Sequence, residues 1–260
     1  MNAPSPVIVH HTVDGPVDAP VVVLSNSLGT DHTMWDPQVE ALARTHRVVR
    51  YDTRGHGRSP APDGPYSIDD LAADVLALLD RLGVERASFC GLSLGGMTGM
   101  ALGRVAPERF DRFVLLCTAA KLGPPAAWRD RAALVRAKGT DAVTDGTVGR
   151  WFTPAFVQER PEVVEQFVTN LRACADEGYA ACCEAIVGLD ELDSLAAVTQ
   201  PTLVIAGADD PATPPEHAEA IVERMPDARL AVVERAAHIA NVERPDEVTA
   251  LVVEHLGAAS

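Results

Sequence analysis

The chain has 260 residues, of which 47% are apolar and 23% charged, and its formal net charge at pH 7 is -15. These values predict one folded domain with a full hydrophobic core, and they exclude a disordered or collagen-like chain. The negative charge argues against nucleic acid or an anionic membrane as a partner, because phosphate binding requires clustered lysine and arginine. We see no apolar run of the ~18 residues that cross a bilayer and no signal-like start, and we expect a cytoplasmic protein. Composition leaves the oligomeric state open.

Seven short runs rich in β-branched residues recur along the chain, and most of them are apolar throughout. Continuous apolar strands that alternate with helices indicate a mainly parallel sheet covered on both faces. The first two runs, separated by Asp14-Gly15-Pro16, predict instead an antiparallel hairpin at the sheet edge. The runs are 7–13, 21–25, 47–52, 87–90, 112–117, 202–206 and 229–234.

Two helices can be placed against this sheet. Between Ser67 and Leu82 apolar residues repeat at helical spacing, with Ser67 as the cap and Gly83 as the stop. A second helix is expected directly after Ser93, ending near Val105. Its several glycines are poor helix formers, but they allow a helix to approach a strand closely.

The strand pattern disappears between Lys121 and about Asp190, where short helical segments are punctuated by proline and glycine. This stretch interrupts the sheet, because strand-like runs lie on both sides of it. We therefore predict an α/β core formed by residues 1–120 and 191–260, with residues 121–190 inserted as a helical cap.

The five cysteines are odd in number and lack the spacing of zinc ligands or redox pairs. We interpret them as reduced and mostly buried residues of the core. Cys117 ends an apolar run and is conceivable as a nucleophile, but a packed strand cysteine is the preferred interpretation. The five are Cys90, Cys117, Cys174, Cys182 and Cys183.

The segment Gly91-Leu92-Ser93-Leu94-Gly95 fits the pattern Gly-x-Ser-x-Gly. Chance alone supplies this pattern in roughly one chain in ten of such length, so the pattern by itself is weak. Its position between a predicted strand and a predicted helix is typical of a strained turn that exposes a nucleophilic serine. A glycine-rich phosphate loop is the alternative, and it lacks the phosphate-binding lysine. Ser93 is the candidate nucleophile.

A serine hydroxyl needs a base, and that base needs an acid to orient it. The turn after the sixth run places Asp209 and Asp210 at the carboxyl end of the sheet, where ligands bind in such folds. We choose Asp210 as the acid, with Asp209 as the alternative. His238 follows the last run and is the predicted base. His32 and His56 also lie in loops, but both precede the nucleophile, against the expected order of serine, acid and histidine.

Two backbone N–H groups are expected to stabilise the negative charge that develops on an attacked carbonyl. Leu94, directly after the serine, supplies one. The loop after the second run, Asn26-Ser27-Leu28-Gly29, offers the N–H of Leu28 as the other. The side chain of Asn26 either holds this loop through backbone hydrogen bonds or serves as a simple turn residue.

Taken together, these features resemble the α/β-hydrolase superfamily over nearly the whole chain. The resemblance rests on the oxyanion loop, the segment Asp52-Thr53-Arg54-Gly55-His56-Gly57-Arg58-Ser59, the serine turn, the aspartate turn and the terminal histidine. It implies an α/β-hydrolase fold with a mostly parallel central sheet, flanking helices and an inserted cap. Many members have His-Gly where this chain has Asn26-Ser27, a departure that indicates a subfamily.

Three separated segments resemble the 3-oxoadipate enol-lactonases of bacterial aromatic catabolism. They are residues 24–30 with Met34-Trp35-Asp36, residues 206–215, and Arg150-Trp151-Phe152-Thr153-Pro154 within the predicted cap. The resemblance implies hydrolysis of 3-oxoadipate enol-lactone to 3-oxoadipate, with no metal and no organic cofactor required. The alternatives are a general carboxylesterase, a cofactor-free haloperoxidase-like perhydrolase and, from another class, a non-catalytic ligand receptor on the same scaffold.

A small lactone that carries a carboxylate requires a local positive group in a protein of charge -15. The predicted cap should supply it, with Trp128 and Trp151 as apolar walls. Helical spacing places Trp128 and Arg131 on one face, which favours Arg131 as the cation. The cationic candidates are Lys121, Arg129, Arg131 and Arg150.

Overall fold

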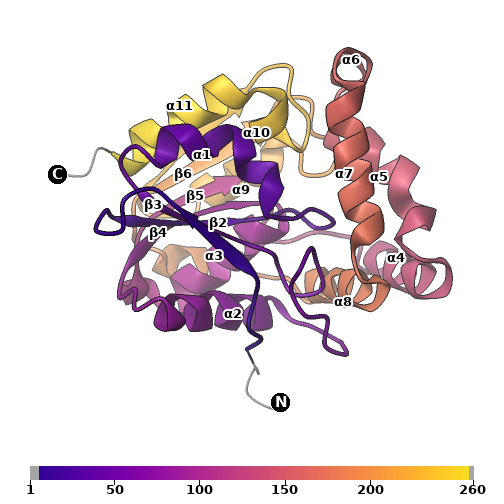
Figure 1. Ribbon diagram of the computed structural model, residues 1–260, viewed down its shortest axis with the longest axis horizontal. Helices are drawn as coiled ribbons and strands as arrows, with labels where there is room; N and C mark the ends of the chain where they lie inside the picture. Colours follow the sequence, from indigo (N-terminus) through magenta and orange to yellow (C-terminus); the bar gives the residue numbers. More distant parts are fainter. Residues whose placement is uncertain (1–5, 258–260) are drawn as a thin grey trace.

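A seven-stranded, mostly parallel β-sheet forms the centre of the protein (Figure 1). The computed structural model describes residues 6–257, and its strands follow the order β1-β3-β2-β4-β5-β6-β7. Every neighbouring pair is parallel except β1 with β3, so the predicted α/β architecture is confirmed. The strands are β1 (His11–Asp14), β2 (Val21–Ser25), β3 (Arg47–Tyr51), β4 (Ala87–Leu92), β5 (Phe110–Leu116), β6 (Thr202–Gly207) and β7 (Ala228–Val233).

The first strand differs from the sequence expectation in both extent and partner. Only His11–Asp14 form a strand, and β1 pairs antiparallel with β3 instead of forming a hairpin with β2. The predicted hairpin is wrong because β2 pairs in parallel with β3 on one side and with β4 on the other, which leaves no free edge of β2 for β1. The half-exposed β1 is therefore left at the edge of the sheet, where burial is least.

Helices cover both faces of the sheet. In Figure 1, α1 and α11 lie on one side of the strands, and α2 and α3 lie on the other. This placement explains why the central strands are apolar on both faces. The helices that flank the sheet are α1 (Asp36–Leu42), α2 (Ile68–Arg81), α3 (Leu94–Val105), α9 (Pro215–Val222), α10 (Ala240–Glu243) and α11 (Pro245–Leu256).

Both helices predicted after the third and fourth strands form at the expected positions. Helix α2 begins after Ser67, whose hydroxyl accepts a hydrogen bond from the N–H of Asp70 while the Asp70 carboxylate accepts one from the N–H of Ser67. This reciprocal capping box satisfies backbone donors that the first turn leaves free. Gly83 follows the helix with φ +66°, a conformation that favours glycine.

A helical segment lies between β5 and β6 in the chain and projects to one side of the sheet (Figure 1). Within it α4 and α8 pack closely, while Trp151 and Phe152 pack against Phe167 of α7. The ends of the predicted core, residues 1–5 and 258–260, lie outside the described residues. The segment consists of α4 (Pro125–Lys138), α5 (Thr144–Trp151), α6 (Pro154–Glu159), α7 (Pro161–Ala173) and α8 (Asp176–Val187).

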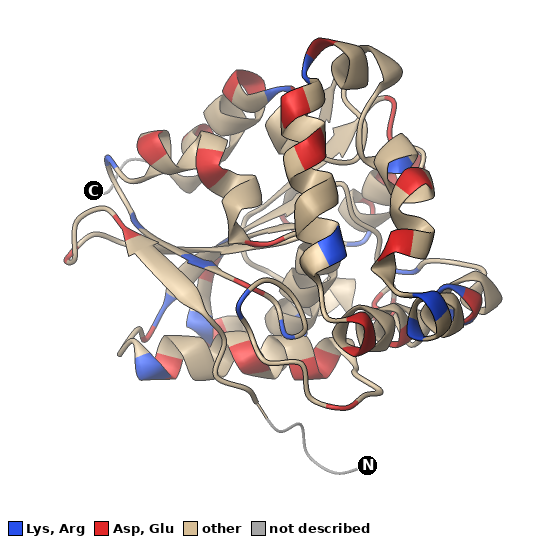
Figure 2. Cartoon of the chain, turned by 45° about the vertical axis from the view of Figure 1, so that its right-hand side comes forward, with Lys and Arg blue, Asp and Glu red and all other residues tan. Residues whose placement is uncertain are grey.

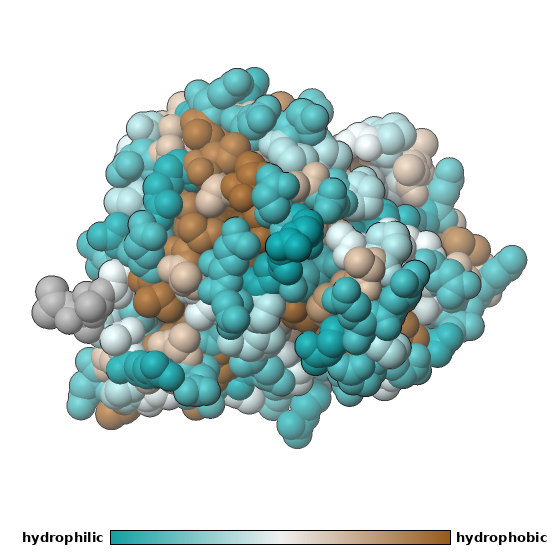
Figure 3. Space-filling view, turned by 90° about the horizontal axis from the view of Figure 1, so that it is seen from above, coloured by the Kyte–Doolittle hydropathy of each residue, from teal (hydrophilic) through white to brown (hydrophobic). Residues whose placement is uncertain are grey.

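Apolar side chains form one continuous core that spans the sheet and reaches into the helical segment. Figure 3 shows one face of the molecule, where hydrophilic side chains surround a limited apolar area. In the part of the chain that the structure describes, no helix combines the length and apolarity needed to cross a membrane.

Candidate active site

Ser93 occupies the sharp turn between β4 and α3, and its backbone has φ 57° and ψ -112°. Such geometry is costly for a residue with a side chain and persists only where the surroundings enforce it. Here the carbonyl of Leu116 accepts the Ser93 N–H at 2.9 Å, and the Thr118 hydroxyl donates to the Ser93 carbonyl at 2.8 Å. The turn also needs Gly91, because a Cβ there would lie 2.3 Å from the backbone of Gly95.

His238 and Asp210 meet although 28 residues separate them. The Nδ1 atom of His238 lies 2.7 Å from Oδ2 of Asp210, and both side chains are buried. Hydrogen bonding to a carboxylate places the proton on Nδ1, which leaves Nε2 as the basic nitrogen. His238 and Ser93 line the same cavity, so the serine turn and the paired His238 and Asp210 meet at the carboxyl end of the sheet.

Asp210 is held in an ionised form. Burial opposes ionisation, but the neighbouring His238 and the hydrogen bonds from Thr213 outweigh it and hold the pKa of this carboxyl below its ordinary value. Its oxygens accept the N–H groups of Ala212 and Thr213 and the hydroxyl of Thr213. Asp209 is exposed instead and makes a backbone hydrogen bond to the Ala236 carbonyl. Of the two carboxylates left open by the sequence, Asp210 contacts the histidine.

Cys117 lies beside this constellation but is poorly suited to nucleophilic chemistry. The thiol is buried, and burial raises the pKa of Cys117 well above its ordinary value. Because the thiolate is the reactive form, such a thiol is inert at neutral pH. The other four cysteines are also free and buried, in agreement with their interpretation as core residues.

The loop after β2 is held firmly next to the serine turn. The Asn26 side chain donates to the Tyr51 carbonyl at 2.7 Å, and the Asn26 carbonyl accepts the Gly95 N–H at 3.0 Å. Leu28 lines the cavity with Ser93, whereas Leu94 is the first residue of α3. A first helical residue has no acceptor for its N–H within the helix, so this N–H remains available for a bound anion.

His56 supports the same loop, a role that the sequence analysis did not assign. Its Nε2 accepts the Gly29 N–H at 2.9 Å, and its Nδ1 lies 3.1 Å from the Arg54 carbonyl. These partners require a neutral ring with the proton on Nδ1. Complete burial lowers the pKa of His56 and so favours that neutral ring. The only sequence signal was its place in the motif around Arg54, which indicates a loop but not a contact.

The cavity at Ser93 is narrow, with a volume of about 50 Å³. Acidic residues are spread over the outer helices (Figure 2), yet none of the described residues that line this cavity is acidic. Leu28, Trp128 and Trp151 supply apolar surface, and Arg131 and Arg150 supply positive charge. The chain is strongly acidic, but this site is locally cationic.

The structure shows which of the four candidate cationic residues lie at the cavity. Arg131 and Arg150 line the cavity, whereas Arg129 is exposed and Lys121 forms a surface ion pair with Asp190 at 2.6 Å. The guanidinium of Arg131 donates to the Tyr179 hydroxyl at 2.9 Å and 2.6 Å. Burial and the nearby charge of Arg131 lower the pKa of Arg150. Two like charges that are partly removed from water form a favourable place for an anion.

Glu243 joins the histidine loop to the helical segment, a contact with no signal in the sequence. Its buried carboxylate accepts the Ala237 N–H, the Thr153 N–H at 2.8 Å and the Thr153 hydroxyl at 2.8 Å. A further backbone bond runs from the N–H of Ile239 to the Trp151 carbonyl at 2.9 Å. These bonds fix the residues on both sides of His238.

We expect Glu243→Gln to lower kcat by about 10-fold with only a moderate loss of Tm, because an amide has one acceptor oxygen where three donors converge. Steady-state kinetics and thermal unfolding check this expectation. Glu247→Gln, at an exposed position on α11, is the matched control and should behave as the wild type. A Glu243→Gln variant with unchanged kcat would show that this carboxylate does not position the histidine loop.

A parallel sheet, a serine on a strained strand-to-helix turn, and a histidine paired with a buried aspartate together define an α/β hydrolase. The chain belongs to the alpha/beta hydrolase fold family, whose model matches residues 20–245.

Known proteins resemble the chain over most of its length. It is 44% identical to 3-oxoadipate enol-lactonase 2 of Acinetobacter baylyi over 92% of this chain and 89% of that enzyme. Identity to 3-oxoadipate enol-lactonase 1 of the same species is 38%, over 90% and 88% of the two chains. The crystal structure of the enol-lactonase from Burkholderia xenovorans LB400 superimposes with a TM-score of 0.94 at 44% identity, over 95% of this chain and 96% of that one. The protein is a hydrolase enzyme.

Proposed function

We propose that the protein hydrolyses 3-oxoadipate enol-lactone to 3-oxoadipate in bacterial aromatic catabolism. The observation that carries this proposal is the cavity that joins Ser93 and His238 to two guanidinium groups without an acidic residue in its described lining. A small anionic ester fits such a site better than a neutral one. The enol-lactonase relatives support lactone hydrolysis as the reaction.

In the proposed mechanism, His238 removes the hydroxyl proton of Ser93 as the oxygen attacks the lactone carbonyl. Asp210 stabilises the imidazolium, and the N–H groups of Leu28 and Leu94 bind the developing oxyanion. The C–O bond of the ring breaks and His238 protonates the leaving enolate, which tautomerises to the ketone. His238 then activates a water that releases the acyl group and regenerates Ser93.

We further propose that residues 121–190 act as a cap that selects the substrate. Arg131 lies within hydrogen-bond distance of Tyr179 of α8 and Thr147 of α5, so two neighbouring helices orient its guanidinium in the cavity wall. A substrate carboxylate bound there would also relieve the repulsion between Arg131 and Arg150. Trp128 and Trp151 would contact the apolar part of the lactone.

The experiment that tests this function follows the ultraviolet absorbance of 3-oxoadipate enol-lactone in the presence of the purified enzyme. A neutral aryl ester assayed in parallel distinguishes the enol-lactonase from a general carboxylesterase, and a peroxide-dependent halogenation assay distinguishes it from a perhydrolase. We expect the enol-lactone to have the highest kcat/KM. Hydrolysis of aryl esters without activity on the lactone would overturn the substrate assignment, and binding without turnover of any ester would indicate a receptor.

Replacing Arg131 tests the carboxylate subsite. Arg131→Gln should raise KM for the lactone roughly 10-fold to 100-fold with little change in kcat, because a hydrogen bond to a charged group contributes about 1.5–3 kcal/mol to binding. Arg129→Gln, on the same helix but exposed, is the control and should leave KM unchanged. An unchanged KM in Arg131→Gln would remove this residue from the subsite.

A further inference from the structure

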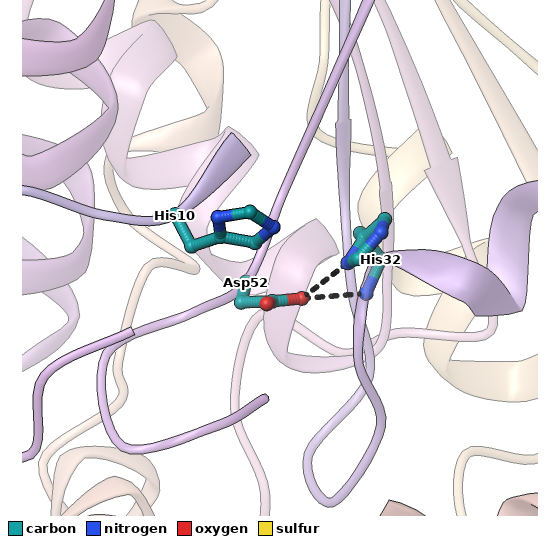
Figure 4. A group of neighbouring side chains, drawn as sticks. All are labelled: His10, His32 and Asp52. Carbon is teal, nitrogen blue, oxygen red and sulfur yellow. Dashed lines mark hydrogen bonds and ion pairs between the residues drawn. The ribbon is translucent and has the colours of Figure 1, made fainter. Parts of the chain in front are cut away.

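A second cluster of polar side chains lies outside the catalytic cavity, where three segments of the chain meet. His10 precedes β1, His32 opens the short helix after the oxyanion loop, and Asp52 follows β3. One nitrogen of each imidazole and one carboxylate oxygen all lie within 4.8 Å of one another. Figure 4 shows a ring nitrogen of His10 directed toward Asp52 and His32. None of the three residues lines the cavity at Ser93.

The backbone around this cluster is well fixed. The N–H of Asp52 donates to the His10 carbonyl at 3.0 Å, and the His10 N–H donates to the Ser59 hydroxyl at 2.8 Å. Oδ1 of Asp52 lies 2.8 Å from both the backbone nitrogen and Nδ1 of His32, while Oδ2 accepts the Arg58 N–H at 2.9 Å. Asp52 is fully buried, so this carboxylate is a rigid centre between the two rings.

His10 is the incomplete member of the cluster. Its Nε2 is buried and has no hydrogen-bond partner among the residues that the structure describes. The two imidazole rings meet edge-on, with centroids 5.5 Å apart, so neither ring satisfies the other. Buried polar nitrogens nearly always have a partner, and an exception in a well-packed region indicates a bound water or ion.

Two imidazoles and one carboxylate are a ligand set that first-row transition metals favour. In a tetrahedral zinc site with bonds of about 2.0–2.2 Å, ligand atoms are separated by roughly 3.3 Å. The separations here, 2.8 Å between His32 Nδ1 and Asp52 Oδ1 and at most 4.8 Å overall, bracket that value.

We propose that His10, His32 and Asp52 bind one divalent transition-metal ion such as Zn²⁺, with water at the remaining position. The site has no part in the hydrolytic steps. Asp52 also accepts the backbone N–H of His32 beside the oxyanion loop, and a bound ion cross-links this point to the segment before β1. Metal binding therefore stabilises the folded enzyme, because the ligands come together only in that state.

The test is a titration of metal-stripped, full-length protein with Zn²⁺ and Co²⁺. Binding is measured by calorimetry and by the absorbance of bound cobalt, and stability is measured as Tm. We expect one equivalent to bind, Tm to rise with metal concentration, and the cobalt spectrum to lack a thiolate charge-transfer band. His10→Ala should weaken binding at least 10-fold and abolish the metal-dependent rise in Tm. Without metal its Tm should stay close to that of the wild type, since the buried Nε2 of His10 has no hydrogen bond to lose.

His11→Ala is the matched control, because its ring is next in the chain but lies outside the cluster. It should bind metal as the wild type does. His32→Ala provides a second variant within the cluster and should also lose binding. The proposal would be overturned by the absence of saturable binding, by equal affinity in His10→Ala and wild type, or by a thiolate band that places the ion on the cysteines.

Discussion

Ser93→Ala should lower kcat for the enol-lactone by about four to six orders of magnitude, because it removes the atom that attacks the carbonyl. The remaining activity would come from the oxyanion donors and from bound water. A single-turnover assay with a large excess of enzyme measures such slow rates. The wild type should also form a covalent adduct with a fluorophosphonate, detected by mass spectrometry on the peptide that contains Ser93, and the variant should not.

Ser88→Ala is the matched control for this experiment. Ser88 is a buried serine on the same strand, five positions before the turn, and it lies outside the cavity lining. Its replacement should leave kcat within about twofold of the wild type, as is usual for a small change away from the reacting atoms. A folded Ser93→Ala variant that retained more than about one hundredth of wild-type kcat would exclude Ser93 as the nucleophile.

Asp210→Asn should lower kcat by about 10⁴-fold, whereas Asp209→Asn should change it by less than about threefold. An amide at position 210 can donate to Nδ1 of His238, and it would then move the imidazole proton to Nε2, the nitrogen that must accept the serine proton. Asp209 does not contact the ring, and its exposed carboxylate is screened by water.

Parallel kinetics of the two asparagine variants, with circular dichroism to verify folding, check this pair of expectations. The depressed pKa of Asp210 adds a pH criterion, since the carboxylate should remain ionised well below neutrality and should not itself cause loss of activity in mildly acidic buffer. Equal losses in both variants, or a larger loss in Asp209→Asn, would contradict the assignment of Asp210 as the triad acid.

Much of the fold follows from local pattern. The largely apolar runs of β2, β4 and β6 predict buried parallel strands, since a strand that is covered on both faces can be apolar at consecutive positions. In a parallel sheet the carboxyl ends of strands lie at one edge, so the loops that carry Ser93, Asp210 and His238 were expected to converge. Ser67 and Gly83 bound α2 for equally local reasons.

Contacts between distant segments were not predictable in this way. Sequence alternation cannot specify which neighbour a strand pairs with, so the partner of β1 depended on how the central strands pack. The distance to His238 was needed to decide between Asp210 and Asp209. The path of the helical segment was needed to show that Arg131 lines the cavity whereas Lys121 lies at the surface.

The sequence by itself determined the order of the strands along the chain, the serine turn and the loops from which the candidate acid and base project, because backbone propensity and apolar periodicity are local properties. Only the tertiary structure showed which carboxylate contacts His238 and that Arg131 and Arg150 line the cavity. It also showed that Glu243 and His56 form hydrogen bonds that hold the loops around the cavity. These are pairings between side chains far apart in sequence, and they are set by the packing of the whole core.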